Sequence, residues 1–412
     1  MQSALVARSV VVPVEAAADL LALLPADGPL SWVRRGEGLV GWGVSASLRT
    51  TGPTRFADGA KWWSELIARA SVTDEVGEPG SGLIAFGSFA FSDDAGIASV
   101  LTVPAVVVGR RGDVAWVTTV GTADEPPTDW HPEPASPATA PRGVAYADGA
   151  LDSEQWMSAV EAAVARIEAG ALEKVVLARD LIATTEEPVD VRWPLTQLAT
   201  SYPMCWTFHV DGLFGATPEL LVRRERGLVT SRVLAGTIRR TGDEMRDAEL
   251  AGALSRSSKD LEEHEYAVRS VADALEPHCS SMNVPEAPFV LHLPNVMHLA
   301  TDVTGVVHDG ITSLELAAAL HPTAAVGGTP RDRAVALIAE LEQMSRDRYA
   351  GPVGWMDAAG DGEWGIALRS ALISDHTVRL FAGCGVVGSS DPASELAESQ
   401  AKLVPVRDAL GG

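Results

Sequence analysis

Lysine and arginine are scarce in this chain, and they form no basic run anywhere along it. Its 412 residues include 32 Lys and Arg against 55 Asp and Glu, which gives a formal net charge of −23. Proteins that bind nucleic acid hold the phosphate backbone with clustered basic side chains, so this surplus of acid excludes a nucleic-acid partner. We expect most of the acidic residues to form a solvated surface.

Cysteine is also rare, and Cys205, Cys279 and Cys384 are widely separated. Three scattered thiols are too few for a disulfide framework or a structural zinc site, which indicates a reducing cytoplasm. Long apolar runs are missing as well, since no segment approaches 18 uninterrupted apolar residues and Arg8 interrupts the apolar N-terminus. We therefore expect a cytoplasmic protein with no secretion signal and no membrane partner.

Apolar residues make up 46% of the chain and charged residues 21%, which predicts a large folded core. Six prolines between Pro126 and Pro141 predict an extended, solvated connector over residues 122–149, with the main boundary near residue 150. Before the connector, apolar patterning predicts one helix around 60–70 and several short strands. These strands are Leu30–Val33, Leu83–Phe91, Leu101–Val108 and Val114–Val120.

Helices and strands are interleaved after the connector. Asp152 can cap a helix that has apolar residues on one face and ends at Gly170. Further helices are predicted at about 246–255, 259–276, 312–320, 330–346 and 392–409. Strands are predicted at 174–183, 205–210, 219–223, 228–233, 289–293, 296–307, 363–374 and 377–387. Many strands with helices between them predict an α+β fold, a large mixed β-sheet core covered by helices.

A glycine-rich segment, 383–388, matches the G-x-G-x-x-G pattern of dinucleotide-binding proteins. That fold needs about 30 residues of strand, helix and strand, whereas 24 residues follow Gly388. Asp391 and Pro392 also have the character of a helix cap and first turn, so Gly388 does not open the helix. We interpret these glycines as positions where a ligand or another backbone segment approaches closely.

Two groups of carboxylates stand on predicted helices. Glu395, Glu398 and Lys402 share one face of the last helix, where Glu398 and Lys402 have the spacing of a surface ion pair. Asp260 and Glu263 have the spacing of a capping box at the start of another helix. If these two helices converge, however, Glu263 and Glu398 would supply the carboxylates that Mg²⁺ takes from a protein.

Two further residues could exchange protons. Lys174 opens an apolar strand, where burial favours loss of the ammonium proton, although a lysine at a strand end can also extend into solvent. Glu219 begins a second apolar run after a turn, where the surroundings could keep its carboxyl group protonated and able to act as an acid. Taken singly, these residues leave both interpretations open.

Taken together, seven ordered motifs across residues 150–406 resemble the chorismate-utilising enzymes. This group contains isochorismate synthase, salicylate synthase, anthranilate synthase component I and aminodeoxychorismate synthase component I. The resemblance implies a core of two packed sheets, with residues 1–150 as the variable N-terminal half of the fold and 151–408 as the chorismate-binding catalytic region. The motifs are Lys174–Arg179, Phe214–Leu221, Leu234–Thr237, Ser258–His264, Met297–Leu299 with Val303–Gly305, Tyr349–Gly354, and Phe381–Lys402.

The resemblance also implies a role for each matching position. Lys174 matches the family's general base and Glu219 its general acid, while Glu263 and Glu398 match ligands of Mg²⁺, with Glu395 acting beside the metal. Arg369 and Lys402 match contacts to the substrate carboxylates. The remaining pocket positions are Gly236, Thr237, His298, Ala325, Tyr349 and Gly383. His264 and His321 receive no role from the resemblance.

The family subtype follows from a few positions. Lysine at 174 favours water over ammonia as the nucleophile, and Ala235 stands where the aminodeoxychorismate enzymes usually have a reactive lysine. The resemblance therefore implies an isochorismate synthase that works on chorismate for menaquinone or siderophore biosynthesis, as a monomer without an amidotransferase partner. Salicylate synthase is the alternative, followed by anthranilate synthase component I. Ile238 departs from the arginine that the family commonly has there.

Overall fold

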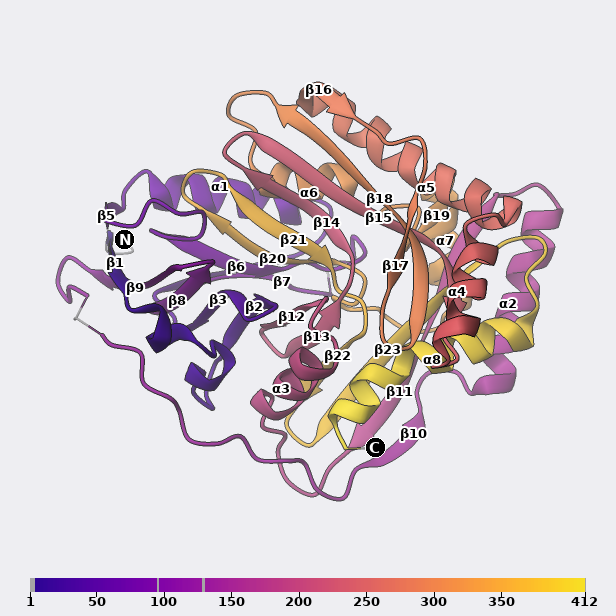
Figure 1. The fold of residues 1–412 in the computed structure, drawn as a ribbon, viewed down its shortest axis with the longest axis horizontal. Coiled ribbons are helices and arrows are strands. Elements are labelled where there is room, and N and C mark those ends of the chain that lie inside the picture. The colour runs from indigo at the N-terminus through magenta and orange to yellow at the C-terminus, as the bar shows by residue number, and fades with distance from the viewer. Residues whose placement is uncertain (1–3, 95, 128–129, 412) are drawn as a thin grey trace.

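The computed structural model describes residues 4–94, 96–127 and 130–411, apart from the side chains of Lys259 and Glu263. Two large β-sheets form its centre, with helices around them (Figure 1). The predicted α+β class is confirmed. Within the described residues no helix is long and apolar enough to cross a membrane.

The first sheet, sheet A, is antiparallel except where β1 and β5 run parallel. Its strands, in spatial order, are β10 (Ala145–Asp148), β11 (Lys174–Thr184), β23 (Thr377–Val386), β22 (Ser370–Ser374), β13 (Leu213–Thr217), β12 (Trp206–Val210), β2 (Leu30–Arg34), β3 (Glu37–Trp42), β8 (Val106–Arg111), β9 (Val114–Thr122), β1 (Leu5–Val12) and β5 (Ser71–Asp74), with β19 (Gly328–Thr329) beside β11.

The second sheet, sheet B, is built from antiparallel pairs. In spatial order its strands are β16 (Cys279–Asn283), β18 (Val296–Val307), β15 (Leu228–Arg239), β14 (Leu220–Glu225), β21 (Gly362–Ile366), β20 (Pro352–Asp357), β6 (Ile84–Ser88), β7 (Ser99–Val103) and β4 (Ala46–Thr50), with β17 (Phe289–His292) beside β18.

The helices pack against the sheets and against one another: α5 lies on β15 and β18, α8 on β23, and α7 on β11 (Figure 1). Their bounds are α1 (Arg55–Ile67), α2 (Ser153–Glu168), α3 (Arg192–Ser201), α4 (Glu244–Leu254), α5 (Ser258–Leu275), α6 (Ser313–Leu320), α7 (Arg331–Leu341) and α8 (Pro392–Ala409). Short 3-10 turns occupy Val14–Ala17, Leu21–Leu23 and Glu276–His278.

A core of aromatic side chains joins the two sheets. Trp32 and Trp116 of sheet A belong to the same buried cluster as Phe86 and Trp355 of sheet B. Strands from both sides of residue 150 enter each sheet, because β2 pairs with β12 and β6 pairs with β20. The N-terminal half thus completes both sheets, and burial of these rings stabilises the fold by roughly 2 kcal/mol for each large side chain.

Two predicted strands are wrong in extent because the chain changes sheets inside them. The run 101–108 divides at Pro104, which has no N–H to donate to a ladder, so β7 lies in sheet B and β8 in sheet A. The run 363–374 divides between β21 of sheet B and β22 of sheet A, and Arg369 adopts a φ of 48° at this crossing. Apolar patterning predicts a strand without specifying its sheet.

The proline-rich connector has no helix or strand over its described residues between 123 and 144, but the expected range 122–149 also contains β10, which pairs with β11. The connector is also not fully solvated. The Trp130 ring packs edge-on against Trp42 with ring centroids 4.9 Å apart, and the Ala135 amide donates to the Ala22 carbonyl. The connector is therefore held against sheet A, which corrects the sequence prediction.

Candidate active site

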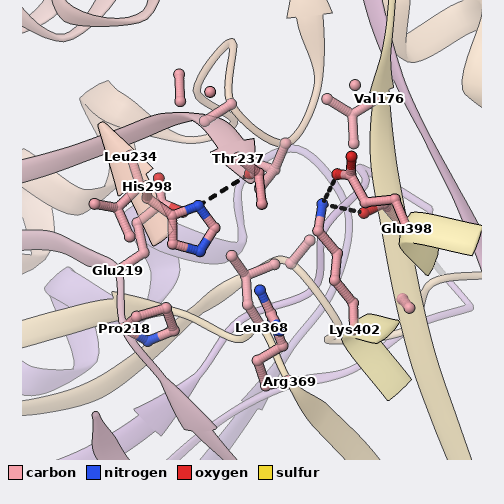
Figure 2. Close-up of a pocket in the computed structure, with 18 of the residues that line it drawn as sticks. Val176, Pro218, Glu219, Leu234, Thr237, His298, Leu368, Arg369, Glu398 and Lys402 are labelled. Carbon is pink, nitrogen blue, oxygen red and sulfur yellow. Dashed lines mark hydrogen bonds and ion pairs between the residues drawn. The ribbon is translucent and has the colours of Figure 1, made fainter. Parts of the chain in front are cut away.

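A cavity of about 210 Å³ opens where β11 and β23 of sheet A approach β15 and β18 of sheet B (Figure 2). Helix α8 forms a further wall. Twelve of the thirteen site residues expected from the sequence line this cavity. They are Lys174, Glu219, Gly236, Thr237, His298, Ala325, Tyr349, Arg369, Gly383, Glu395, Glu398 and Lys402. Glu263 belongs to α5, but its side chain lies outside the part of the chain that the structure describes.

Glu219 occupies the junction between β13 and β14, where Pro218 breaks the ladder and the chain passes from sheet A to sheet B. Its amide donates to the Thr217 hydroxyl, and its carbonyl accepts from the Ile366 amide. Burial raises the pKa of the carboxyl group to about 8, against the opposing charges of Lys174, Lys402 and Arg369. The carboxyl group therefore holds a proton near neutral pH and can donate it.

Lys174 is the first residue of β11, and it pairs with Thr329 of β19. Its side chain is 8% exposed and lines the same cavity as Glu219. Val176 also lines the cavity, because residues two apart in a strand project to the same face. The strand thus delivers a buried amine to the cavity wall, so the interpretation of Lys174 as a solvent-directed strand end is wrong.

Helix α8 brings a carboxylate and an amine into the cavity together. Lys402 Nζ lies 2.6 Å from Glu398 Oε1 and donates to the Gly383 carbonyl at 2.9 Å (Figure 2). Burial raises the pKa of Glu398, but the charges of Lys402 and Arg369 outweigh it and hold that pKa below its usual range. The ion pair predicted from the i, i+4 spacing exists, but it lines the cavity and not the outer surface of the helix.

Glu395 and Glu398 also face each other. A carboxylate oxygen of each and the Sγ of Cys384 all lie within 4.8 Å of one another. Glu395 Oε1 accepts from the Ser390 hydroxyl at 2.8 Å, while the Cys384 thiol donates to the Glu395 carbonyl. Two carboxylates at this separation fit a hard divalent cation, which prefers oxygen ligands.

A bulge in β15 places Thr237 beside His298. Ala235 pairs with Leu299 but Thr237 pairs with His298, because Gly236 is extruded from the ladder with a φ of 75°. The Thr237 hydroxyl lies 3.0 Å from His298 Nδ1 (Figure 2). Burial, with the charges of Arg369 and Lys402, lowers the pKa of His298 to about 3, so the ring is neutral. Its Nε2 has no hydrogen-bond partner among the described residues.

The remaining wall is aromatic and cationic. Tyr349 stacks on Phe381 with ring centroids 5.0 Å apart and an interplanar angle of 10°. Arg369 is buried where the chain crosses from β21 to β22. An added Cβ on Gly383 would lie 3.0 Å from the Leu177 carbonyl oxygen, so a larger residue would displace β11. The glycine-rich segment allows close approach of a backbone, and its last residues precede a helix capped by Asp391, as expected.

The site residues expected from the sequence leave out other cavity residues, among them Asp260, Arg346 and Phe381. The predicted capping box at Asp260 is wrong, because Ser257 is the helix cap and accepts from the Asp260 amide. Asp260 could have been found as the position one turn before Glu263 on the same helical face.

The two histidines without an assigned role are core residues. His264 contacts the Ala235 carbonyl and the Thr301 hydroxyl, and His321 contacts the Phe91 carbonyl.

Comparison with known proteins places this geometry in a family. A family model described as chorismate binding enzyme matches residues 30–411. The chain is 39% identical over 266 residues to the isochorismate synthase MenF of Bacillus subtilis, covering 64% of this chain but little more than half, 56%, of that relative. It is 41% identical over 272 residues to the isochorismate synthase DhbC of the same organism, covering 63% of this chain and 68% of that relative.

A solved structure agrees over nearly the whole length of both chains. The structure of a putative 2,3-dihydroxybenzoate-specific isochorismate synthase, DhbC from Bacillus anthracis, superposes with a TM-score of 0.78 at 31% identity. The superposition covers 95% of this chain and 98% of that one. The family model, the relatives and the fold agree, and the chain belongs to the chorismate binding enzyme family.

Proposed function

We propose that this chain is an isochorismate synthase, an isomerase that interconverts chorismate and isochorismate. Water adds at C2 of chorismate and the C4 hydroxyl group departs as water, so one oxygen is exchanged and the composition of the substrate is unchanged. One observation carries the proposal: Glu219 holds its proton near neutral pH in the same buried cavity as the amine of Lys174. The names of the relatives support the same activity.

Lys174 and Glu219 divide the proton transfers between them. Lys174, as the general base, accepts a proton from water as the water oxygen attacks C2, and ends the step as an ammonium group. Protonated Glu219 donates its proton to the departing C4 hydroxyl, which leaves as water. General acid and general base catalysis of this kind each contribute roughly 10²- to 10⁴-fold to a rate. The reverse reaction uses the same two residues in exchanged roles.

Chorismate is a dianion, so the cavity must offset the negative charge of the protein. Arg369 and Lys402 are the cations assigned to its two carboxylates, with Glu398 holding Lys402 in place. Six further lining residues orient the ring and its enolpyruvyl group. These are Gly236, Thr237, His298, Ala325, Tyr349 and Gly383. Local charge at the cavity decides binding, even though the whole chain carries −23.

The carboxylates of α8 are suited to Mg²⁺. Glu395 and Glu398 offer carboxylate oxygens within 4.8 Å of each other. Glu263 and Glu398 are the ligands expected from the sequence, with Glu395 beside the metal. When bound, Mg²⁺ would neutralise and orient a substrate carboxylate. The enzyme is proposed to work in the cytoplasm as a monomer, without an amidotransferase partner.

Incubation with chorismate and Mg²⁺ in H₂¹⁸O tests the proposal. We expect isochorismate that carries one ¹⁸O atom at C2. Chromatography separates this product, and mass spectrometry measures its mass. Omitting Mg²⁺ should suppress its formation. Salicylate together with pyruvate would identify a salicylate synthase, while unchanged chorismate would overturn the proposed activity.

A further inference from the structure

A buried ion pair at the edge of the cavity has no part in the proposed chemistry. Glu342 follows α7 and pairs with Arg346, and their side chains are 1% and 3% exposed. The guanidinium group binds the carboxylate with two nitrogens, Nη2 to Oε1 at 2.5 Å and Nε to Oε2 at 2.9 Å. Such a forked contact fixes orientation as well as distance.

The pair completes an interrupted edge of β11. One edge of this strand pairs with β23 from Val175 to Thr184. The other edge pairs with β19 at its start and with β10 near its end, and among the described residues no strand pairs with the middle of this edge. Side chains fill this gap: Glu342 accepts from the Ala178 amide at 2.7 Å, and Arg346 donates to the Val176 carbonyl at 2.7 Å.

Arg346 also contacts the segment that leads into β19 beside β11. Its Nη1 donates to the Val326 carbonyl at 2.9 Å, while its guanidinium carbon lies 4.3 Å from the centre of the Phe91 ring. Val176 and Val326 both line the cavity, as does Arg346 itself. One guanidinium group therefore ties the strand that begins at Lys174 to the segment that carries Ala325.

Stability alone does not account for such a pair. Two buried charges lose their hydration, and replacing a buried pair by apolar residues of similar volume is often neutral or stabilising. The contacts to β11 and to the Val326 carbonyl are what an apolar pair would lack. A misplacement of about 1 Å at a reacting group can cost roughly 100-fold in rate.

We infer that Glu342 and Arg346 are positioning residues, which hold the β11 backbone against the Ala325–Val326 segment and so set the place of the Lys174 amine in the cavity. The kinetic part of this inference rests on the proposed function, whereas the structural part does not. The pair acts through the backbone of β11 and has no direct part in the proton transfers.

Arg346→Lys tests the inference, because one ammonium group cannot reach the Glu342 carboxylate and both carbonyls with the same geometry. Arg192→Lys is the matched control. Arg192 is buried, pairs with Asp190 at 2.6 Å and donates to the Leu24 and Ser136 carbonyls, but it does not line the cavity. We expect Arg346→Lys to lower kcat by roughly 10- to 100-fold with KM within about twofold, and Arg192→Lys to keep both constants.

Hydrogen exchange gives a second readout that does not need turnover. Arg346→Lys should accelerate exchange in peptides that cover 175–178, whereas Arg192→Lys should not. If Arg346→Lys fails to fold, the double variant Glu342→Leu with Arg346→Met leaves no unpaired charge and should fold but show the same slow turnover and fast exchange.

The outcomes separate the inference from the proposed function. If the wild-type protein forms isochorismate and the Arg346 variant keeps its kcat, the inference is overturned and the function stands. If the wild-type protein leaves chorismate unchanged, the function fails and exchange at 175–178 decides the structural part. Equal rates of hydrogen exchange at 175–178 in the Arg346 and Arg192 variants would overturn the structural part of the inference.

Discussion

The Thr237 hydroxyl lies 3.0 Å from His298 Nδ1, and this contact depends on one extra residue in β15. Gly236 takes up the bulge with a φ of 75°, which most residues with a side chain adopt only under strain. Without the bulge, position 237 would lose its place opposite His298 and face the other side of the sheet. The glycine therefore controls the orientation of a neutral histidine in the cavity.

Thr237→Val should raise the KM for chorismate. The variant keeps the shape of the side chain but removes the hydrogen bond that orients the His298 ring. A lost hydrogen bond of about 1 kcal/mol corresponds to roughly a fivefold rise in KM, with kcat changed less. Steady-state kinetics measures both constants. Thr230→Val is the control, since Thr230 lies in the same strand opposite Thr304 and does not line the cavity; equal KM values for the two variants would contradict this role.

Glu219→Gln should change how stability depends on pH. Burial raises the pKa of Glu219 from 4.5 to about 8, so between these values the folded chain binds a proton that the unfolded chain releases. As the pH rises through this window, the wild-type free energy of unfolding should therefore fall relative to that of the variant, by up to roughly 1.4 kcal/mol per pH unit. Above pH 8 the difference should level off.

Urea unfolding at pH 5.5 and pH 8.0, without substrate or metal, measures this difference. Glu161→Gln, at an exposed position on α2, should follow the wild-type curve at both pH values. Wild-type and Glu219→Gln curves that shift equally with pH would show that Glu219 is ionised in the folded protein. The proposed acid would then lack its proton.

The sequence predicts much of the local structure in this catalytic region. The strand Val296–Val307 and the helix 392–409 have the predicted bounds, because apolar periodicity and the Asp391 cap are local signals. The cavity depends on contacts between distant segments. Arg346 lies four residues after Glu342, yet its partners Val176 and Val326 are 170 and 20 residues away, and no local pattern indicates them.

Lys174→Arg should separate the role of a base from that of a positive charge. Arginine is always positively charged and does not release a proton near neutral pH, so it cannot accept one from water. We expect kcat to fall by roughly 10²- to 10⁴-fold, in line with the contribution of a general base. Lys174→Ala should lose at least as much. Lys61→Arg, at an exposed position on α1, should leave turnover unchanged. Near wild-type kcat in Lys174→Arg would rule out the lysine as the base.

Glu398→Ala should specifically weaken the binding of Mg²⁺ by the enzyme. The variant removes an oxygen ligand from the pair that Glu395 and Glu398 form, and it also frees Lys402 from its ion pair. We expect the Mg²⁺ concentration for half-maximal activity to rise by roughly 10- to 100-fold, as for the loss of a group that supports a metal site. Titration of activity with Mg²⁺ at saturating chorismate measures it.

Asp408→Ala is the matched control for this titration, because it removes a carboxylate from an exposed position of the same helix. Its half-maximal Mg²⁺ concentration should equal that of the wild-type protein. Binding of Mn²⁺, measured by electron paramagnetic resonance without substrate, should weaken in Glu398→Ala alone. A Glu398→Ala protein with unchanged Mg²⁺ and Mn²⁺ titrations would mean that the α8 carboxylates serve Lys402 and the substrate, and that the metal binds elsewhere.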